Sequence, residues 1–128
     1  MSPNQQFLQK LYDAFNAREI ETLIAAMRQD VKWANGLEGG FVFGRDAVRE
    51  YWIEQFKMIR PELDPLEFDT DAAGRDVVRV RQVVMGLEGD VLADMTVHQI
   101  FTIENGLISV YEIGETVTIQ EIIDEAKG

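Results

Sequence analysis

The sequence contains no cysteine, a single histidine and no long apolar run. Without cysteine, a disulfide scaffold and thiol chemistry are excluded. A membrane-spanning helix needs about 20 consecutive apolar residues, and no stretch approaches that length. The first ten residues also lack the apolar segment of a signal peptide. We therefore expect a cytoplasmic protein without membrane contact.

Basic residues are scarce as well. Twelve Lys and Arg face 23 Asp and Glu, so the formal net charge is −11, and the basic residues are scattered along the chain. Nucleic acids and anionic membrane surfaces need clustered Lys and Arg, which argues against both as partners. One histidine and dispersed acidic residues do not give metal-ligand spacing. We predict neither a metal nor a cofactor.

The 128 residues have the length of one domain, which we assign to residues 1–128. Apolar residues at helical spacing predict a helix beginning at Ser2-Pro3, a short helix through Met27, and a third helix that ends near Arg60, before Pro61. A short strand over 30–35 separates the last two. From Leu66 the pattern alternates, with breaks at glycines, which is typical of an antiparallel meander. The order predicts an α+β domain. Residues 117–128 form either a frayed tail or a last short helix.

Side-chain alternation divides the meander into two faces. If Glu88-Gly89 is a two-residue turn, one face is strongly apolar and carries two amides, Gln82 and Gln99. The turn around Asn105-Gly106 has two interpretations. A two-residue turn at Asn105-Gly106 places Glu112 beside Gln99, whereas a three-residue loop over 104–106 places Tyr111 there and sends Ile113 inward. We favour the three-residue loop.

The glycine-rich stretch "WANGLEGG" (residues 33–40) raises the question of phosphate binding. It lacks the Lys-Ser/Thr of a P-loop and the spacing of a dinucleotide fingerprint. We interpret it as a bend that turns Trp33 and Asn35 inward. His98 falls on the opposite face from Gln82 and Gln99, which predicts a surface or interface histidine. That outer face also carries apolar side chains (Val83, Met85, Ile100, Ile108 and Val110), so we expect a homodimer through it.

Three predicted N-terminal helices with "LYDAFNAREIETLIAAM", followed by a short strand, "GRDAVREYW" and a long sheet, resemble the SnoaL-like branch of the nuclear transport factor 2-like superfamily over residues 4–115. Ketosteroid isomerase, polyketide cyclases, scytalone dehydratase and limonene-epoxide hydrolase are members of that superfamily. The resemblance implies a cone-shaped fold in which the three helices pack on a strongly bent antiparallel sheet around a central pocket.

The catalytic positions of these relatives are not matched. The helix-one tyrosine of the isomerase falls on Leu11, next to Tyr12. Its general base falls on Asn35, its protonated aspartate on Gln99, and its second tyrosine on Trp52. The His-x-Asp pair of the cyclases falls on Tyr111 and Ile113. Amides donate and accept hydrogen bonds but do not take a proton near neutral pH.

The predicted site is thus a neutral pocket for a small, mostly apolar, uncharged molecule, lined by Trp33, Asn35, Trp52, Gln82, Gln99 and Tyr111. Three classes of function remain open. The protein is an isomerase, cyclase, dehydratase or hydrolase, a non-catalytic small-molecule binder, or a dimeric interaction domain with a vestigial cavity.

Overall fold

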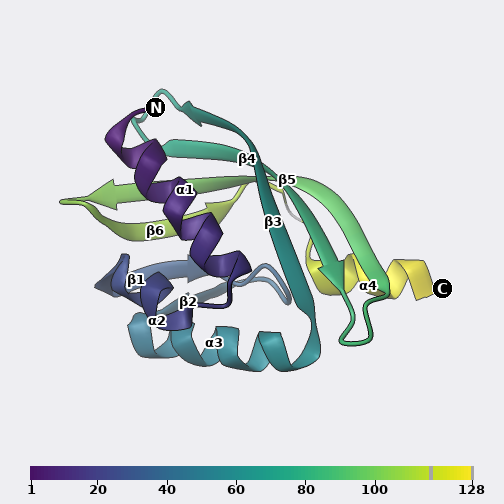
Figure 1. Cartoon of the computed structure of the whole chain (residues 1–128). Helices are drawn as coiled ribbons and strands as arrows, with labels where there is room; N and C mark the ends of the chain where they lie inside the picture. The colour runs from purple at the N-terminus through teal and green to yellow at the C-terminus, as the bar shows by residue number, and fades with distance from the viewer. Residues whose placement is uncertain (116, 128) are drawn as a thin grey trace.

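The structure is a computed structural model that describes residues 1–115 and 117–127. In chain order its elements are α1 (Pro3–Asn16), α2 (Ile20–Ala25), β1 (Met27–Ala34), β2 (Phe41–Phe43), α3 (Arg45–Met58), β3 (Arg60–Thr70), β4 (Asp76–Met85), β5 (Val91–Glu104), β6 (Leu107–Ile113) and α4 (Ile119–Lys127). The strands form one curved sheet in the order β2-β1-β6-β5-β4-β3, as Figure 1 shows. The predicted α+β class is confirmed.

The first helix begins where the sequence indicates. The Ser2 side chain accepts a hydrogen bond from the backbone of Gln5, the Gln5 side chain accepts one from the backbone of Ser2, and Pro3 takes the first helical position. The face of α1 that carries Leu8, Leu11 and Tyr12 is buried. This helix packs mainly on β3, whereas α2 and α3 pack on each other and on β1.

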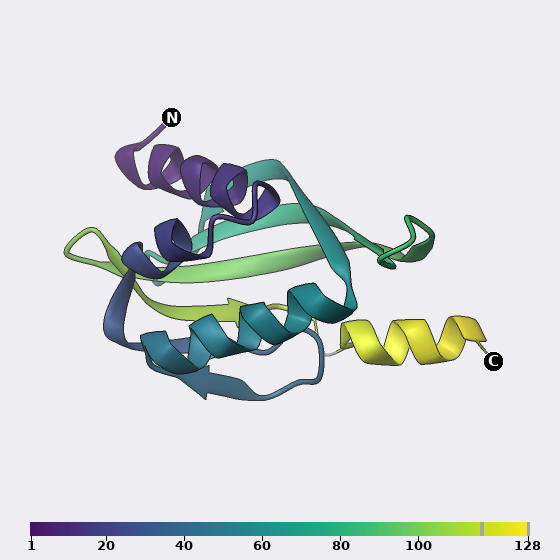
Figure 2. The same ribbon diagram turned by 60° about the horizontal axis from the view of Figure 1, so that its bottom comes forward.

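The sheet is antiparallel, as expected, at every neighbouring pair except one: β1 pairs parallel to β6, which makes the sheet mixed. Figure 2 shows α1 and α3 lying across the curved sheet, with α4 at the end where β4 turns into β5. The sheet and the helices enclose the main hydrophobic core. A second, smaller core joins α4 to the sheet through Leu37, Ile59, Val84, Ala93, Ile119 and Ile123.

Strand β2 was not predicted, and two further boundaries differ markedly from the predictions. Met27 opens β1 instead of closing α2, and β3 begins at Arg60 instead of Leu66. Proline interrupts a sheet only where its missing N–H is needed, and β3 is an edge strand that tolerates Pro61 and Pro65. The sheet therefore extends closer to α3 than the alternating pattern indicated.

The register between β4 and β5 follows the prediction, since Val84 pairs with Ala93 and Gln82 with Met95. The turn itself is longer than predicted: Gly86 and Asp90 pair around three residues, and an irregularity between Val84 and Met85 restores the expected register. The face assignments survive because the longer loop and the bulge compensate for each other.

The β5–β6 turn is where the favoured prediction is wrong. Asn105 and Gly106 form a two-residue turn with φ of 51° and 78°, and Glu104 pairs with Leu107. A bulge then shifts the register, so that Gln99 faces Ile113 and Phe101 faces Tyr111. Tyr111 and Ile113 still point inward. The two-residue turn moves Ile108 from its predicted place on the outer face into the core, where it pairs with Ile103 and is fully buried.

Candidate functional site

A cavity lies between the helices and the concave face of the sheet. Its described lining comprises Leu11, Tyr12, Phe15, Leu23, Trp33, Ala34, Gly36, Tyr51, Trp52, Gln55, Leu63, Gln82, Met95, Val97, Gln99, Phe101, Tyr111, Ile113, Val117 and Ile119. None of these side chains carries a charge. The empty space within the lining is about 690 Å³ when the open mouth is included, but the centre of a water molecule fits in only about 60 Å³ of it. The cavity is narrow, neutral and mostly apolar.

One hydrogen-bonded pair crosses the cavity wall from α1 to β5. The Tyr12 hydroxyl donates to Oε1 of Gln99 at 2.7 Å, and both residues are almost fully buried. Tyr12 lies on the buried face of α1, and Gln99 alternates with Val97 and Phe101 on the inner face of β5. Because the tyrosine occupies the amide oxygen, the Gln99 amide nitrogen remains available as a donor.

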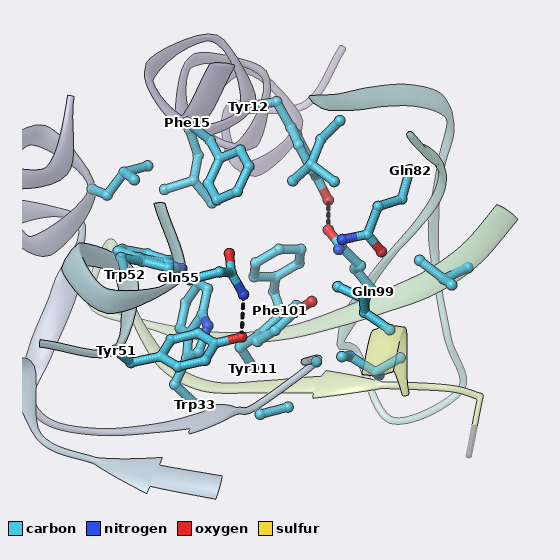
Figure 3. Close-up of a pocket in the computed structure, with 18 of the residues that line it drawn as sticks. Tyr12, Phe15, Trp33, Tyr51, Trp52, Gln55, Gln82, Gln99, Phe101 and Tyr111 are labelled. Atoms are coloured by element: carbon cyan, nitrogen blue, oxygen red, sulfur yellow. Dashed lines mark hydrogen bonds between the residues drawn. The ribbon is translucent and has the colours of Figure 1, made fainter. Parts of the chain in front are cut away.

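A second pair lies within α3. Nε2 of Gln55 donates to the Tyr51 hydroxyl at 2.7 Å, across one helical turn. Gln55 is 4% exposed, and it follows Val48 and Trp52 on the buried face of the helix. Figure 3 shows the two pairs apart from each other, with Phe101 and Tyr111 drawn between them. The cavity therefore has two polar regions joined by aromatic walls.

The aromatic side chains pack against one another along the wall. The Trp33 ring lies 5.1 Å from Trp52 in an edge-to-face arrangement and 4.2 Å from Tyr111, and Phe101 lies 5.2 Å from Tyr111. Contacts of this kind hold flat surfaces rigidly in place. A planar apolar molecule would find complementary faces here.

The cavity tyrosines hold their protons strongly. Burial raises the pKa of Tyr51 to about 12, although the backbone N–H groups of Leu37 and Gly36 and the Gln55 amide oppose the shift. Burial also raises the pKa of Tyr12 well above its usual value, with a smaller contribution from Tyr111. The pKa of Tyr111 rises for the same reason, with smaller contributions from Tyr51 and Glu115. All three are hydroxyl groups at neutral pH, not bases.

Five of the six predicted site residues line this cavity: Trp33, Trp52, Gln82, Gln99 and Tyr111. No hydrogen bond joins Gln82 to Gln99 among the described residues. Gln82 is partly exposed at its position opposite Met95 and Leu63. Its amide faces the cavity without a side-chain partner in the described part of the chain.

Contrary to the prediction, the structure does not place Asn35 in this cavity. Its side-chain oxygen accepts hydrogen bonds from the backbone N–H groups of Leu37 and Glu38 at 3.1 and 2.9 Å. Strand β1 ends at Ala34. The alternation that directs Trp33 inward therefore does not extend to Asn35. Asn35 instead shapes the glycine-rich bend, as asparagine commonly does in turns.

Tyr12, Tyr51 and Gln55 were missed as site residues. The sequence carried a signal for each of them: Tyr12 lies on the apolar face of the first helix, and Tyr51 and Gln55 lie around Trp52 at helical spacing. His98 is exposed on the outer face as predicted, where its backbone N–H and Nδ1 both contact Glu115.

The described residues contain neither a metal-binding cluster nor a helix that could span a membrane. No three His, Asp or Glu side chains in 1–115 and 117–127 converge closely enough to hold a metal ion. No helix in the same ranges has both the length and the apolar character needed to cross a membrane.

Comparison with known proteins places these features in context. The SnoaL-like domain model matches residues 8–111. An NTF2-like protein of unknown function from Burkholderia pseudomallei is 27% identical, with a TM-score of 0.81 and 97% of each chain covered. TerC, co-crystallized with polyporic acid, is also 27% identical, with a TM-score of 0.79 and coverage of 96% of this chain and 99% of TerC.

More distant structures share the fold. Rv0760c from Mycobacterium tuberculosis, solved in complex with estradiol-17beta-hemisuccinate, is 15% identical, with a TM-score of 0.77 and coverage of 91% of this chain and 96% of that protein. No curated protein matches the chain.

Proposed function

Because the chain belongs to the SnoaL-like domain family, we propose that its central cavity binds a small, planar, uncharged molecule that carries hydroxyl or carbonyl groups. The observation that carries this proposal is the lining itself: aromatic walls, three amides and three tyrosine hydroxyls, without a charged side chain among the described lining residues. Mostly apolar surface with a few convergent polar groups is the usual composition of a small-molecule site. The co-crystal of TerC with polyporic acid supports the use of this fold for a small molecule.

The same lining favours binding over proton-transfer catalysis. The described lining residues include no carboxylate, histidine or lysine, and burial keeps the tyrosines protonated. General acid–base catalysis requires a group whose pKa lies near the working pH. Of the reactions known among similar proteins, those that begin with removal of a proton by the enzyme lack their base here. We therefore propose a binding protein in preference to an isomerase, cyclase, dehydratase or hydrolase.

Isothermal titration calorimetry with 2-naphthol and 2-naphthoate tests the proposal, because the two ligands match in size and differ in charge. We expect 2-naphthol to bind at least tenfold more tightly near neutral pH, since burial of a carboxylate without a cation costs on the order of several kcal/mol. Replacement Gln55→Leu should weaken 2-naphthol binding by roughly fivefold, the effect of losing one hydrogen bond.

The control is Gln6→Leu, which makes the same change at an exposed position of α1. It should leave both affinities unchanged. Equal or tighter binding of 2-naphthoate, or no binding of either ligand, would show that the proposed ligand class is wrong.

We also propose that two copies associate through the outer face of the sheet. Val83, Met85, Ile100 and Val110 lie on that face, each partly exposed in the single chain. A group of apolar side chains on one sheet face favours association, because contact with a second copy removes it from water.

A further inference from the structure

Gln55 is a polar side chain at a buried position of α3 where packing alone does not require one. It occupies the position after Val48 and Trp52 on the buried face of the helix, where an apolar side chain of similar size would fill the same space. Burying an amide costs free energy unless its polar atoms are paired. Nε2 is paired with Tyr51, but Oε1 has no hydrogen-bond partner among the described residues. The contact with Tyr51 therefore accounts for the amide nitrogen of Gln55 but not for its oxygen.

The unpaired oxygen is not sealed inside the protein. Within residues 1–115 and 117–127, no fully buried side-chain nitrogen or oxygen is left without a hydrogen bond. An atom without a partner must therefore border open space. Gln55 lines the cavity and also a more open hollow beside α3, and Figure 3 draws its oxygen on the side of Phe15, toward the cavity. The Gln55 oxygen is consequently available as a hydrogen-bond acceptor.

Gln99 presents the opposite group. Tyr12 occupies its oxygen, so its amide nitrogen is the atom left over. The same reasoning places that nitrogen at the edge of open space, since Gln99 is 5% exposed and also lines the cavity. In each pair the tyrosine hydroxyl determines which amide atom, nitrogen or oxygen, is already hydrogen-bonded. The two amides thus offer a donor at β5 and an acceptor at α3.

The arrangement suits a ligand that carries a different polar group at each end, and we call its recognition by the two amides two-ended selection. This inference rests on the proposed function. We infer that Gln99 binds a carbonyl oxygen of the ligand and Gln55 binds a hydroxyl group at its other end, with the aromatic walls around the apolar middle. The ligand class is then an aromatic molecule with a phenolic hydroxyl at one end and a ketone or similar carbonyl at the other. Tyr51 acts as a positioning residue, because it holds the Gln55 amide in the orientation that exposes oxygen.

Three neutral ligands separate the two contacts. In 4-(4-hydroxyphenyl)-2-butanone both groups are present, 4-phenyl-2-butanone lacks the hydroxyl, and 4-butylphenol lacks the carbonyl. For the unaltered protein we expect calorimetry to show that loss of either group weakens binding by about fivefold, the effect of one hydrogen bond.

The variants should respond in opposite ways. In Gln55→Leu the preference for the hydroxyl should disappear while the preference for the carbonyl stays, and in Gln99→Leu the reverse should hold. Tyr51→Phe should reduce the hydroxyl preference without abolishing binding. Circular dichroism checks folding, and Gln55→Met serves as a second variant if leucine disturbs α3. An unchanged hydroxyl preference in folded Gln55→Leu or Gln55→Met overturns the inference.

The outcomes also distinguish this inference from the proposed function. If 2-naphthol binds but the three ligands bind equally or not at all, two-ended selection is wrong and the neutral cavity remains. If no neutral ligand binds, the proposed function itself is wrong.

Discussion

The tyrosines are the residues whose chemistry the fold changes most. The chain has three, and Tyr12, Tyr51 and Tyr111 all line the cavity. Their sequence positions lie in three different elements, α1, α3 and β6. Burial raises the pKa of each one, to about 12 for Tyr51. Every tyrosine in the protein therefore reports on the state of the cavity.

A pH dependence follows from these shifts. An unfolded tyrosine loses its proton near pH 10, whereas the folded tyrosines retain theirs to higher pH. Above about pH 10 the unfolded state binds fewer protons, so the free energy of unfolding should fall by up to about 1.4 kcal/mol per pH unit for each tyrosine. Below that pH these groups should contribute no pH dependence.

Tyrosinate absorbance measures this directly, and urea denaturation at a series of pH values measures the stability. The native protein should show little tyrosinate until the pH approaches 12, whereas the protein in concentrated urea should titrate near pH 10. Ionisation of the native protein near pH 10 would mean that the tyrosines are accessible to water and that the cavity is open.

At this scale the sequence predicted what depends on alternation within a strand. Gln82 and Gln99 could be placed because facing residues of paired strands share a face, whereas Tyr111 points inward because the bulge in β6 offsets the unexpected two-residue turn. Asn35 could not be placed, because it lies just beyond the end of β1, where a side-chain oxygen is also a good partner for backbone N–H groups of the following turn. Gln55 was overlooked because a glutamine on an apolar helix face resembles an ordinary surface position until the neighbouring elements are known.

Among the elements, α4 depended most on the structure. Its nine residues were predicted as either a frayed tail or a helix, since an isolated helix of that length is marginal in water. Packing decides between these. Ile119 and Ile123 join the second core, and the backbone N–H groups of Ile119 and Gln120 donate to the carbonyls of Gly36 and Leu37. The helix is thereby attached to the glycine-rich bend at the mouth of the cavity.

We predict that Ile123→Asp detaches α4 while the sheet stays folded. The charge would lie at a position that is 7% exposed, where burial without a partner is costly. Hydrogen exchange should show loss of protection at the amides of Ile119 and Gln120, because local opening needs only α4 to move. Amides in the β4–β5 pair should remain protected.

The matched control is Gln120→Asp, which adds the same charge at an exposed position of α4. It should leave the exchange of α4 unchanged. Loss of protection throughout the sheet in Ile123→Asp would instead show that α4 and the sheet unfold as one unit.

The β-bulges limit how far the register of the strands could be predicted from the sequence. The bulges in β5 and β6 each add one residue, and no residue type in "VLADM" or "LISVY" marks the extra position. At the β4–β5 turn the loop and the bulge compensate, and the prediction holds. At the β5–β6 hairpin the two-residue turn places Ile108 opposite Ile103 and so in the core, and the bulge that follows returns Tyr111 and Ile113 to the inner face.

For the molecule as a whole, the sequence predicted the family and the fold but not a reaction. The family and the α+β cone are confirmed, because they follow from element order and hydrophobic pattern over most of the chain. The chemistry depends on a few side chains, and the same fold hosts unrelated functions. Whether two chains assemble depends on surface residues that the fold of one chain does not constrain.

Assembly is tested on the outer sheet face. Ile100 lies there next to Val77 and Glu112 in the neighbouring strands, and it is partly exposed in the single chain. If two copies meet on this face, a glutamate at position 100 would be buried in the interface without a cationic partner, which is costly. We predict that the unaltered protein sediments as a dimer at micromolar concentration and that Ile100→Glu sediments as a monomer with the same circular dichroism spectrum. Leu87→Glu, an equivalent change at an exposed residue of the β4–β5 loop, should remain dimeric. A monomeric unaltered protein, or a dimer that persists in Ile100→Glu, would show that this face is not the interface.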